Sequence, residues 1–149
     1  MKCVLLRGVS GSGKSSHANK LAEKAGRSSF ICSADKYFTD SNGNYHFIHE
    51  CLDKAHEYCF TSFVQSCHNM TRVIIIDNTN TQLHEISPYL AYAKFAGYKV
   101  EIVRMSCILA VASERNIHKV PLDVILRQGQ RFQNLPSYWQ LETVVETNG

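Results

Sequence analysis

The segment that most constrains this chain is residues 8–15, which reads GVSGSGKS and lies between two stretches of different character. Residues 3–6 before it are apolar and suit a buried strand, whereas residues 16–24 after it are compatible with a helix. Glycine adopts positive φ angles that other residues avoid, so Gly8, Gly11 and Gly13 permit a tight loop whose successive N–H groups turn inward. The sequence therefore predicts a strand, a glycine-rich loop and a helix in immediate succession.

The spacing of this segment also matches G-x-x-x-x-G-K-[S/T], the pattern of the phosphate-binding P-loop. In that arrangement Lys14 reaches the β- and γ-phosphates, and the Ser15 hydroxyl completes the shell of a Mg²⁺ ion. A glycine-rich turn without a ligand is the alternative. We predict ATP and Mg²⁺ as cofactors, with a nucleotide site made of Gly8, Val9, Ser10, Gly11, Ser12, Gly13, Lys14, Ser15 and Ser16.

Length and composition favour one domain over residues 1–149, because 149 residues with 44% hydrophobic content can bury a single core. No apolar stretch approaches the roughly 20 residues that cross a bilayer, so we expect no membrane association. Because the first apolar run begins almost at Met1, we expect no cleavable leader and a cytoplasmic or nuclear location. The net charge of +3 permits a polyanionic partner without requiring one, and the oligomeric state stays unknown.

Strand-like and helix-like segments alternate along the chain. The β-rich runs are residues 3–6, 29–32, 72–76 and 99–103, and the helix-compatible segments between them are residues 15–25, 48–68 and 82–95. Such alternation predicts an α/β fold with three α/β/α layers and a parallel sheet, as in kinase-type P-loop NTPases.

The last third of the chain has a helical pattern that breaks at Val120 and Pro121. We interpret residues 107–133 as a C-terminal helical lid, with Pro121 in the first turn of a new helix. Residues 134–149 are expected to form a packed extension that frays over its last three residues.

Two aspartates follow predicted strands, at the sheet edge where open α/β folds bind ligands. Asp35 can accept the proton of an attacking hydroxyl as a general base, although a helix cap is the alternative. Asp77 directly follows a run of four apolar residues, which is the Walker-B pattern. Its carboxylate can hold a Mg²⁺-bound water or position an arginine that binds the substrate. Asn78 and Asn80 continue that loop as candidate contacts to the acceptor, and a plain turn explains them nearly as well.

A basic cluster lies in the predicted lid and comprises Arg115, His118, Lys119, Arg127 and Arg131. Arg115 directly precedes the break in the helical pattern, where a lid arginine can compensate the charge that develops on a transferring phosphoryl group. A solvated helix face is the alternative for each arginine. The guanine-reading N-K-x-D motif is absent, which argues against a small GTPase.

Four segments occur in one order: the P-loop, S-A-D-K-Y-F at residues 33–38, I-D-N-T-N at residues 76–80, and Arg115-Asn116 with Val120-Pro121. Together they resemble the polynucleotide 5′-hydroxyl kinase family, especially the P-loop domain of Nedd-binding-protein type. The resemblance implies that Lys14 and Ser15 handle ATP–Mg²⁺. It also implies that Asp35 is the general base toward a 5′-hydroxyl, that Asp77 organises the acceptor site and that Arg115 clamps the donor phosphates.

One position departs from that family. The phage polynucleotide kinase has an arginine three residues after its base, and this chain has Phe38 there. Tyr37 and Phe38, together with Tyr45 and Phe47 across a short turn, could stack on a nucleobase instead, with inward packing as the alternative.

The sequence thus predicts a kinase that transfers the ATP γ-phosphate to a 5′-hydroxyl end of DNA or RNA. The main alternative hypothesis is a small-molecule kinase acting on a nucleoside, sugar or hydroxy acid. The third hypothesis is a nucleotide-binding module without catalysis. The predicted catalytic residues are Lys14, Asp35 and Arg115; the substrate-binding residues are Asp35, Tyr37, Asp77, Asn78 and Asn80; the metal ligands are Ser15 and Asp77.

Overall fold

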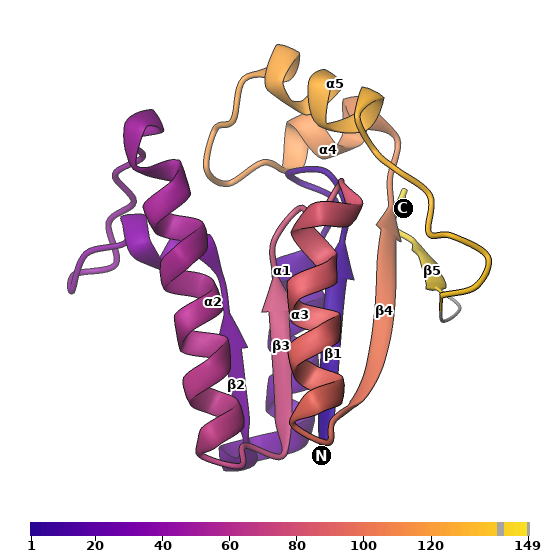
Figure 1. The fold of residues 1–149 in the computed structure, drawn as a ribbon. Coiled ribbons are helices and arrows are strands. Elements are labelled where there is room, and N and C mark those ends of the chain that lie inside the picture. The colour runs from indigo at the N-terminus through magenta and orange to yellow at the C-terminus, as the bar shows by residue number, and fades with distance from the viewer. Residues whose placement is uncertain (140–141, 149) are drawn as a thin grey trace.

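Five parallel strands form one sheet in the order β2-β3-β1-β4-β5 in the computed structural model, which describes residues 1–139 and 142–148 (Figure 1). The strands are β1 (Lys2–Arg7), β2 (Ser29–Cys32), β3 (Val73–Asp77), β4 (Lys99–Ser106) and β5 (Glu142–Glu146). The four strands predicted from the sequence are confirmed, and β5 is additional.

The helices are α1 (Lys14–Ala25), α2 (Leu52–His68), α3 (Leu83–Phe95), α4 (Leu109–Arg115) and α5 (Leu122–Gln130), with short 3-10 turns η1 (Gly26–Ser28), η2 (Ala34–Phe38) and η3 (His49–Cys51). In Figure 1, α2 and α3 cover one face of the sheet, α1 covers the other, and α4 and α5 lie above the carboxyl ends of the strands. Among the described helices, none has the length and apolar character that crossing a membrane requires.

The side chains of β1 alternate between the two faces of the sheet, and this alternation explains why helices cover both faces. Cys3 and Leu5 are buried in the core shared with α2 and α3, whereas Val4 and Leu6 are buried in the core shared with α1. Successive strand residues point to opposite faces, so a strand that is apolar throughout is buried on both sides. The predicted three-layer α/β architecture is confirmed.

The helical lid packs directly on the P-loop. Val9 is buried against Ala112 of α4 and Ile125 of α5, and Gln128 of α5 both accepts a hydrogen bond from the Ser10 N–H (2.8 Å) and donates one to the Ser10 hydroxyl (3.1 Å). Pro121 is at the N-cap of α5 rather than in its first turn. The predicted break in the helical pattern is therefore confirmed, and the new helix begins one residue later than predicted.

The P-loop and the lid pack tightly at Gly11, whose φ is +81°. A Cβ added to Gly11 would lie 1.8 Å from the carbonyl oxygen of Ala112, which no side chain tolerates. Glycine at this position is therefore required by the contact as well as by the backbone angle.

The prediction of a packed extension over residues 134–149 is wrong in part. Residues 142–146 form β5, which pairs with β4 in parallel, as the β-branched residues of this segment favour. Thr147 donates its N–H to the Ser106 carbonyl (2.9 Å), and the Asn148 side chain accepts from the Ile108 N–H (2.6 Å). Thr147 and Asn148 are thus held rather than frayed, and Gly149 lies outside the described residues.

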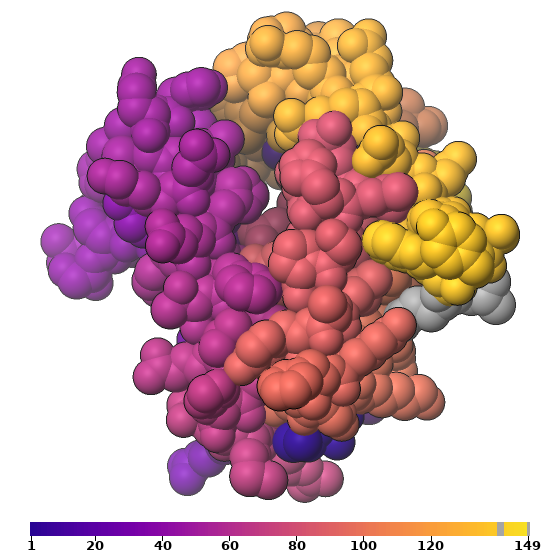
Figure 2. Space-filling view, viewed as in Figure 1, coloured from indigo at the N-terminus to yellow at the C-terminus, as the bar shows by residue number. Residues whose placement is uncertain are grey.

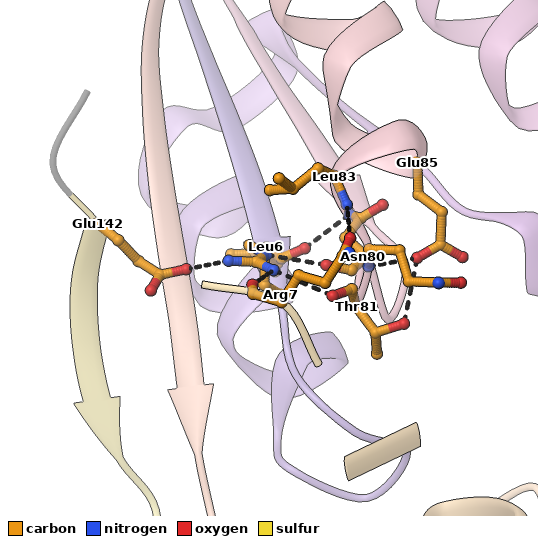
Figure 3. A network of polar contacts seen from close by, with 9 residues as sticks. Leu6, Arg7, Asn80, Thr81, Leu83, Glu85 and Glu142 are labelled. Atoms are coloured by element: carbon orange, nitrogen blue, oxygen red, sulfur yellow. Dashed lines mark hydrogen bonds and ion pairs between the residues drawn. The ribbon is translucent and has the colours of Figure 1, made fainter. Parts of the chain in front are cut away.

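Arg7, the last residue of β1, is fully buried and joins four segments (Figure 3). Its Nε donates to the Asn80 carbonyl (2.8 Å), its Nη1 to the Glu142 carboxylate (2.7 Å) and its Nη2 to the Gln133 carbonyl (2.6 Å). The guanidinium also lies 4.4 Å from the ring centroid of Phe132. Burial lowers the pKa of Arg7, and the bond to Glu142 opposes that shift.

Replacing Arg7 should therefore destabilise the whole domain. Arg7→Met leaves the Glu142 carboxylate and the carbonyls of Asn80, Thr81 and Gln133 without the Arg7 donors, so the free energy of unfolding should fall by about 3–5 kcal/mol. Urea unfolding measures this change. The matched control is Arg127→Met, because Arg127 forms an exposed pair with Asp123 (2.7 Å) and its loss should cost less than about 1 kcal/mol. Equal losses in the two variants would show that the Arg7 network does not hold the fold together.

The contact at Gly11 yields a second prediction, with Gly43 as its control. Both have positive φ, but a Cβ at Gly43 meets nothing within 4 Å. Gly43→Ala should cost about 1–2 kcal/mol from backbone strain alone. Gly11→Ala should cost roughly 1–3 kcal/mol more from overpacking and should speed amide hydrogen exchange in α4. Unchanged exchange in α4 would contradict the close packing of loop and lid.

Candidate active site

The P-loop adopts the conformation that its glycines predict. Gly8, Gly11 and Gly13 have φ angles of +152°, +81° and +92°. The loop is tied to the neighbouring strand, since the Gly8 N–H donates to the carbonyl of Thr79 after β3 (2.9 Å). Its position at the carboxyl edge of the sheet, followed by the N-terminus of α1, suits the binding of phosphate oxygens.

Lys14 is buried rather than exposed on a surface loop, with 8% of its surface accessible. Its Nζ donates to the Val9 carbonyl (2.8 Å), so the side chain folds back along the loop. Burial lowers the pKa of Lys14, and the nearby carboxylates of Asp77 and Asp35 oppose this shift. The ammonium is therefore within electrostatic reach of both predicted acidic residues.

Asp77 ends β3 and is also buried, with 8% of its surface accessible. Burial raises the pKa of Asp77, whereas the charge of Lys14 and a hydrogen bond from Ser15 lower it. The two predicted metal ligands thus lie beside each other. A hydroxyl and one carboxylate suit Mg²⁺, which keeps several waters and takes further oxygens from substrate phosphates. Among the described residues, no group of three or more histidine, cysteine, aspartate or glutamate side chains could hold a metal ion.

Asp35 lies in η2, directly after β2, where the Ser33 side chain accepts a hydrogen bond from the Asp35 N–H (3.3 Å). Its Oδ1 accepts a hydrogen bond from the Tyr45 hydroxyl (3.2 Å), and its Oδ2 lies 3.5 Å from Nε2 of His118. Burial, followed by the charge of Asp35, raises the pKa of Tyr45. About half of the Asp35 side chain (48%) remains exposed, so it can meet an incoming group.

A cleft of about 1640 Å³ joins these elements. Figure 2 shows the molecule hollowed between α2 and α3, below the lid. The predicted site residues that line this cleft are Ser10, Gly11, Gly13, Lys14, Ser15, Ser16, Asp35, Asp77, Asn78, Asn80 and Arg115. The fold thus brings most of the predicted nucleotide and acceptor residues to one cavity, whereas Gly8 and Val9 line a separate pocket of about 410 Å³ beside α5.

Arg115, in the last turn of α4, lines the cleft, and its guanidinium donates a hydrogen bond to the Thr147 carbonyl. The Thr147 hydroxyl in turn donates to the Ser12 carbonyl of the P-loop (2.9 Å). The end of the chain therefore holds the lid arginine beside the phosphate loop. Sequence reasoning missed Thr147, although the run Glu142-Thr143-Val144-Val145-Glu146 before it carries a strand signal.

The two predicted asparagines are bonded within the protein. The Asn78 side chain accepts from the Ala34 N–H (2.9 Å) and donates to the Cys59 sulfur (3.3 Å), which braces the segment that carries Asp35. The Asn80 side chain donates to the Leu6 carbonyl (2.7 Å). Both residues also line the cleft, so their contact with an acceptor stays a prediction.

Four aromatic residues lie in η2 and in the hairpin of residues 38–47, which the antiparallel bridge between Thr39 and Tyr45 closes. Phe38 is buried, as the inward-packing alternative predicts, and Tyr37 packs edge-on against it with ring centroids 5.4 Å apart. Tyr37 is not among the described residues that line the cleft, so nothing in the geometry supports its predicted contact with substrate. Phe38, Tyr45 and Phe47 do line the cleft, and Phe47 is half exposed (51%).

Comparison with solved structures relates this fold to kinases. A gluconokinase from Sinorhizobium meliloti matches 97% of this chain and 82% of its own with a TM-score of 0.61 and 15% identity. A sugar kinase from Janibacter sp. matches 99% of this chain and 85% of its own, with a TM-score of 0.61 and 16% identity. The structure of the Pnkp1/Rnl/Hen1 RNA repair complex contains a chain that matches 88% of this one and 43% of its own, with a TM-score of 0.69 and 16% identity. These likenesses show the kinase-type P-loop fold.

Sequence comparison gives a nearer relative and a family. NEDD4-binding protein 2 of Homo sapiens is 37% identical over 138 residues, which are 90% of this chain and 8% of the relative's length. The chain therefore spans a small part of that protein. The family model described as an AAA domain matches residues 3–135, so with its P-loop and kinase-type fold the chain belongs to this AAA domain family.

Proposed function

We propose that the chain is an ATP-dependent kinase that transfers the γ-phosphate to the 5′-hydroxyl end of a polynucleotide. The observation that carries the proposal is the convergence of Lys14, Asp77 and Asp35, because the buried ammonium lies within the electrostatic influence of both carboxylates in one cleft. Such a site needs a phosphate-binding loop, an acid beside the loop and a second acid that faces the acceptor, and each is supplied by a different element.

In the proposed reaction, different residues bind the phosphates of ATP and the metal ion. The P-loop N–H groups and Lys14 bind the phosphates of ATP and counter their charge. Ser15 and Asp77 would hold Mg²⁺, directly or through water, and the ion when bound neutralises charge on the phosphate oxygens. Arg115 contributes a further positive charge from the lid.

Asp35 acts on the acceptor. The acceptor oxygen bonds to the γ-phosphorus as the bond from that phosphorus to the bridging oxygen of ADP breaks, and the hydroxyl proton passes to the Asp35 carboxylate. The hydrogen bond from Tyr45 leaves one carboxylate oxygen with further capacity to accept this proton.

Two lines of support favour a polynucleotide acceptor. The segments that carry Asp35 and Asp77 resemble the 5′-hydroxyl kinases, and one of the solved structures with this fold is an RNA repair complex that contains Pnkp1. The cleft is also larger than a small alcohol requires, and Lys119, Arg127 and Arg131 line it with positive charge suited to a phosphate backbone.

A small-molecule alcohol is the second candidate acceptor. The gluconokinase and the sugar kinase share this fold over 82% and 85% of their chains, so the fold serves small acceptors as readily. The same base and lid would act in either case.

A matched panel of acceptors separates the two candidates. With labelled ATP, 5′-hydroxyl oligonucleotides should be phosphorylated with a higher kcat/KM than nucleosides, gluconate or hexoses. Their kcat/KM should fall as salt rises, because binding a strand releases counterions. Efficient phosphorylation of a nucleoside or sugar, without salt dependence, would reject the polynucleotide acceptor in favour of the small one.

The role of Asp35 is tested with Asp40 as a matched control on the same hairpin. Asp35→Asn keeps the shape of the side chain but removes the proton acceptor, so kcat should fall by about 10²- to 10⁴-fold while ATP binding is preserved. Asp40 accepts hydrogen bonds from Asn42 and Asn44 at the turn, so Asp40→Asn should leave kcat within about twofold. Loss of ATP binding in Asp35→Asn by the same factor as kcat would reassign Asp35 to a structural role.

A further inference from the structure

His118 connects the lid to the residue that we assign as the base. It lies in the loop between α4 and α5, 83 positions beyond Asp35 in the chain, and its Nε2 lies 3.5 Å from Oδ2 of Asp35. The imidazole also stacks on the ring of Tyr45, with ring centroids 4.0 Å apart and an interplanar angle of 29°. The contact is partly shielded, because 29% of the His118 side chain is exposed.

Tyr45 contacts the other oxygen of the Asp35 carboxylate. An antiparallel bridge to Thr39 fixes Tyr45 on the hairpin, and its hydroxyl donates to Oδ1 of Asp35. Each oxygen of the Asp35 carboxylate therefore faces a different side chain, one from the hairpin and one from the lid. Because those side chains stack on each other, rotation of the carboxylate is restrained from both sides.

The turn that presents His118 is itself well defined. The Asn116 side chain donates to the Val120 carbonyl (2.6 Å), and the Lys119 N–H donates to the Asn116 carbonyl (3.2 Å). Lys119 has a φ of +52°, a left-handed conformation that a lysine adopts only where its surroundings require it. The loop is thus built to hold the imidazole in one place.

A second histidine shows what is particular to His118. His46 lies 3.1 Å from a carboxylate oxygen of Asp40, but both residues are on the same hairpin and the His46 side chain is 66% exposed. Neither is among the described residues that line the cleft. Contact between an imidazole and a carboxylate is therefore not distinctive by itself. His118 is distinctive because it lies in the lid and contacts a carboxylate that lines the cleft.

We propose that His118 is a positioning residue, which docks the lid loop on Tyr45 and orients the Asp35 carboxylate toward the acceptor hydroxyl. This inference rests on the proposed function. His118 takes no proton in the transfer: the hydroxyl proton passes to Asp35, and the imidazole acts by holding that carboxylate while the lid is closed. Lid closure and alignment of the base thereby become one event.

The test is a double-mutant cycle between His118 and Asp35. With the best acceptor of the panel, His118→Ala should lower kcat by about tenfold or more, since misplacing a reacting group by a fraction of an ångström has effects of this order. The KM for ATP should change by less than about twofold, because His118 acts on the acceptor side. In the Asp35→Asn background the same substitution should change kcat by less than about twofold.

Two further variants separate positioning from folding of the lid. His118→Gln keeps a hydrogen-bonding group and should restore part of the lost kcat. His46→Ala removes the other imidazole that faces an aspartate and should leave kcat unchanged. Amide hydrogen exchange over residues 116–121 should be faster in His118→Ala than in wild type and unchanged in His46→Ala, and this readout needs no turnover.

The outcomes distinguish the inference from the function on which it rests. If wild type phosphorylates an acceptor and His118→Ala matches it, or lowers kcat by the same factor with and without Asp35, the positioning role is overturned and the kinase stands. If wild type phosphorylates no member of the panel, the proposed function fails and the role of His118 fails with it.

Discussion

One buried guanidinium joins the segments from which the candidate site is built. Arg7 directly precedes the P-loop, and its donors bind the loop after β3, the segment that leaves the lid, and β5. A fully buried arginine is stable only when its donors are satisfied, so these segments cannot move independently of it. The acidic end of β3 and the phosphate loop therefore keep a defined separation before any ligand binds, which is the preorganisation that phosphoryl transfer requires.

Three of the contacts between the lid and the rest of the domain differ in chemical character. Close backbone packing joins Gly11 to Ala112, Arg115 reaches the P-loop through Thr147, and His118 reaches the Asp35 carboxylate. The first contact sets how near the lid lies to the P-loop. The others place one cationic side chain beside the P-loop and one imidazole beside Asp35. In the proposed reaction, one helical pair would therefore act on both the donor and the acceptor.

Local patterns were enough to predict four of the five described strands, the P-loop and the position of Asp35 and Asp77, because a parallel sheet brings the carboxyl ends of its strands to one edge. Contacts between distant segments could not be predicted in that way. Arg7 is recognisable from the sequence only as a charge at a strand end, because nothing there shows that Glu142 lies beside it. The strand signal of residues 142–146 likewise does not show that this segment pairs with β4, which is far from it in sequence. The surroundings of Tyr37 could not be predicted either, because which face of a 3-10 turn meets α2 is a tertiary property.

In the proposed reaction, one sheet edge aligns donor and acceptor for direct transfer, with Asp35 as base rather than nucleophile. The stereochemical course of transfer from ATP made chiral at the γ-phosphorus tests it most directly. A single in-line displacement predicts inversion at phosphorus in the phosphorylated acceptor. Retention of configuration would require two displacements and a phosphorylated enzyme, and would contradict the account.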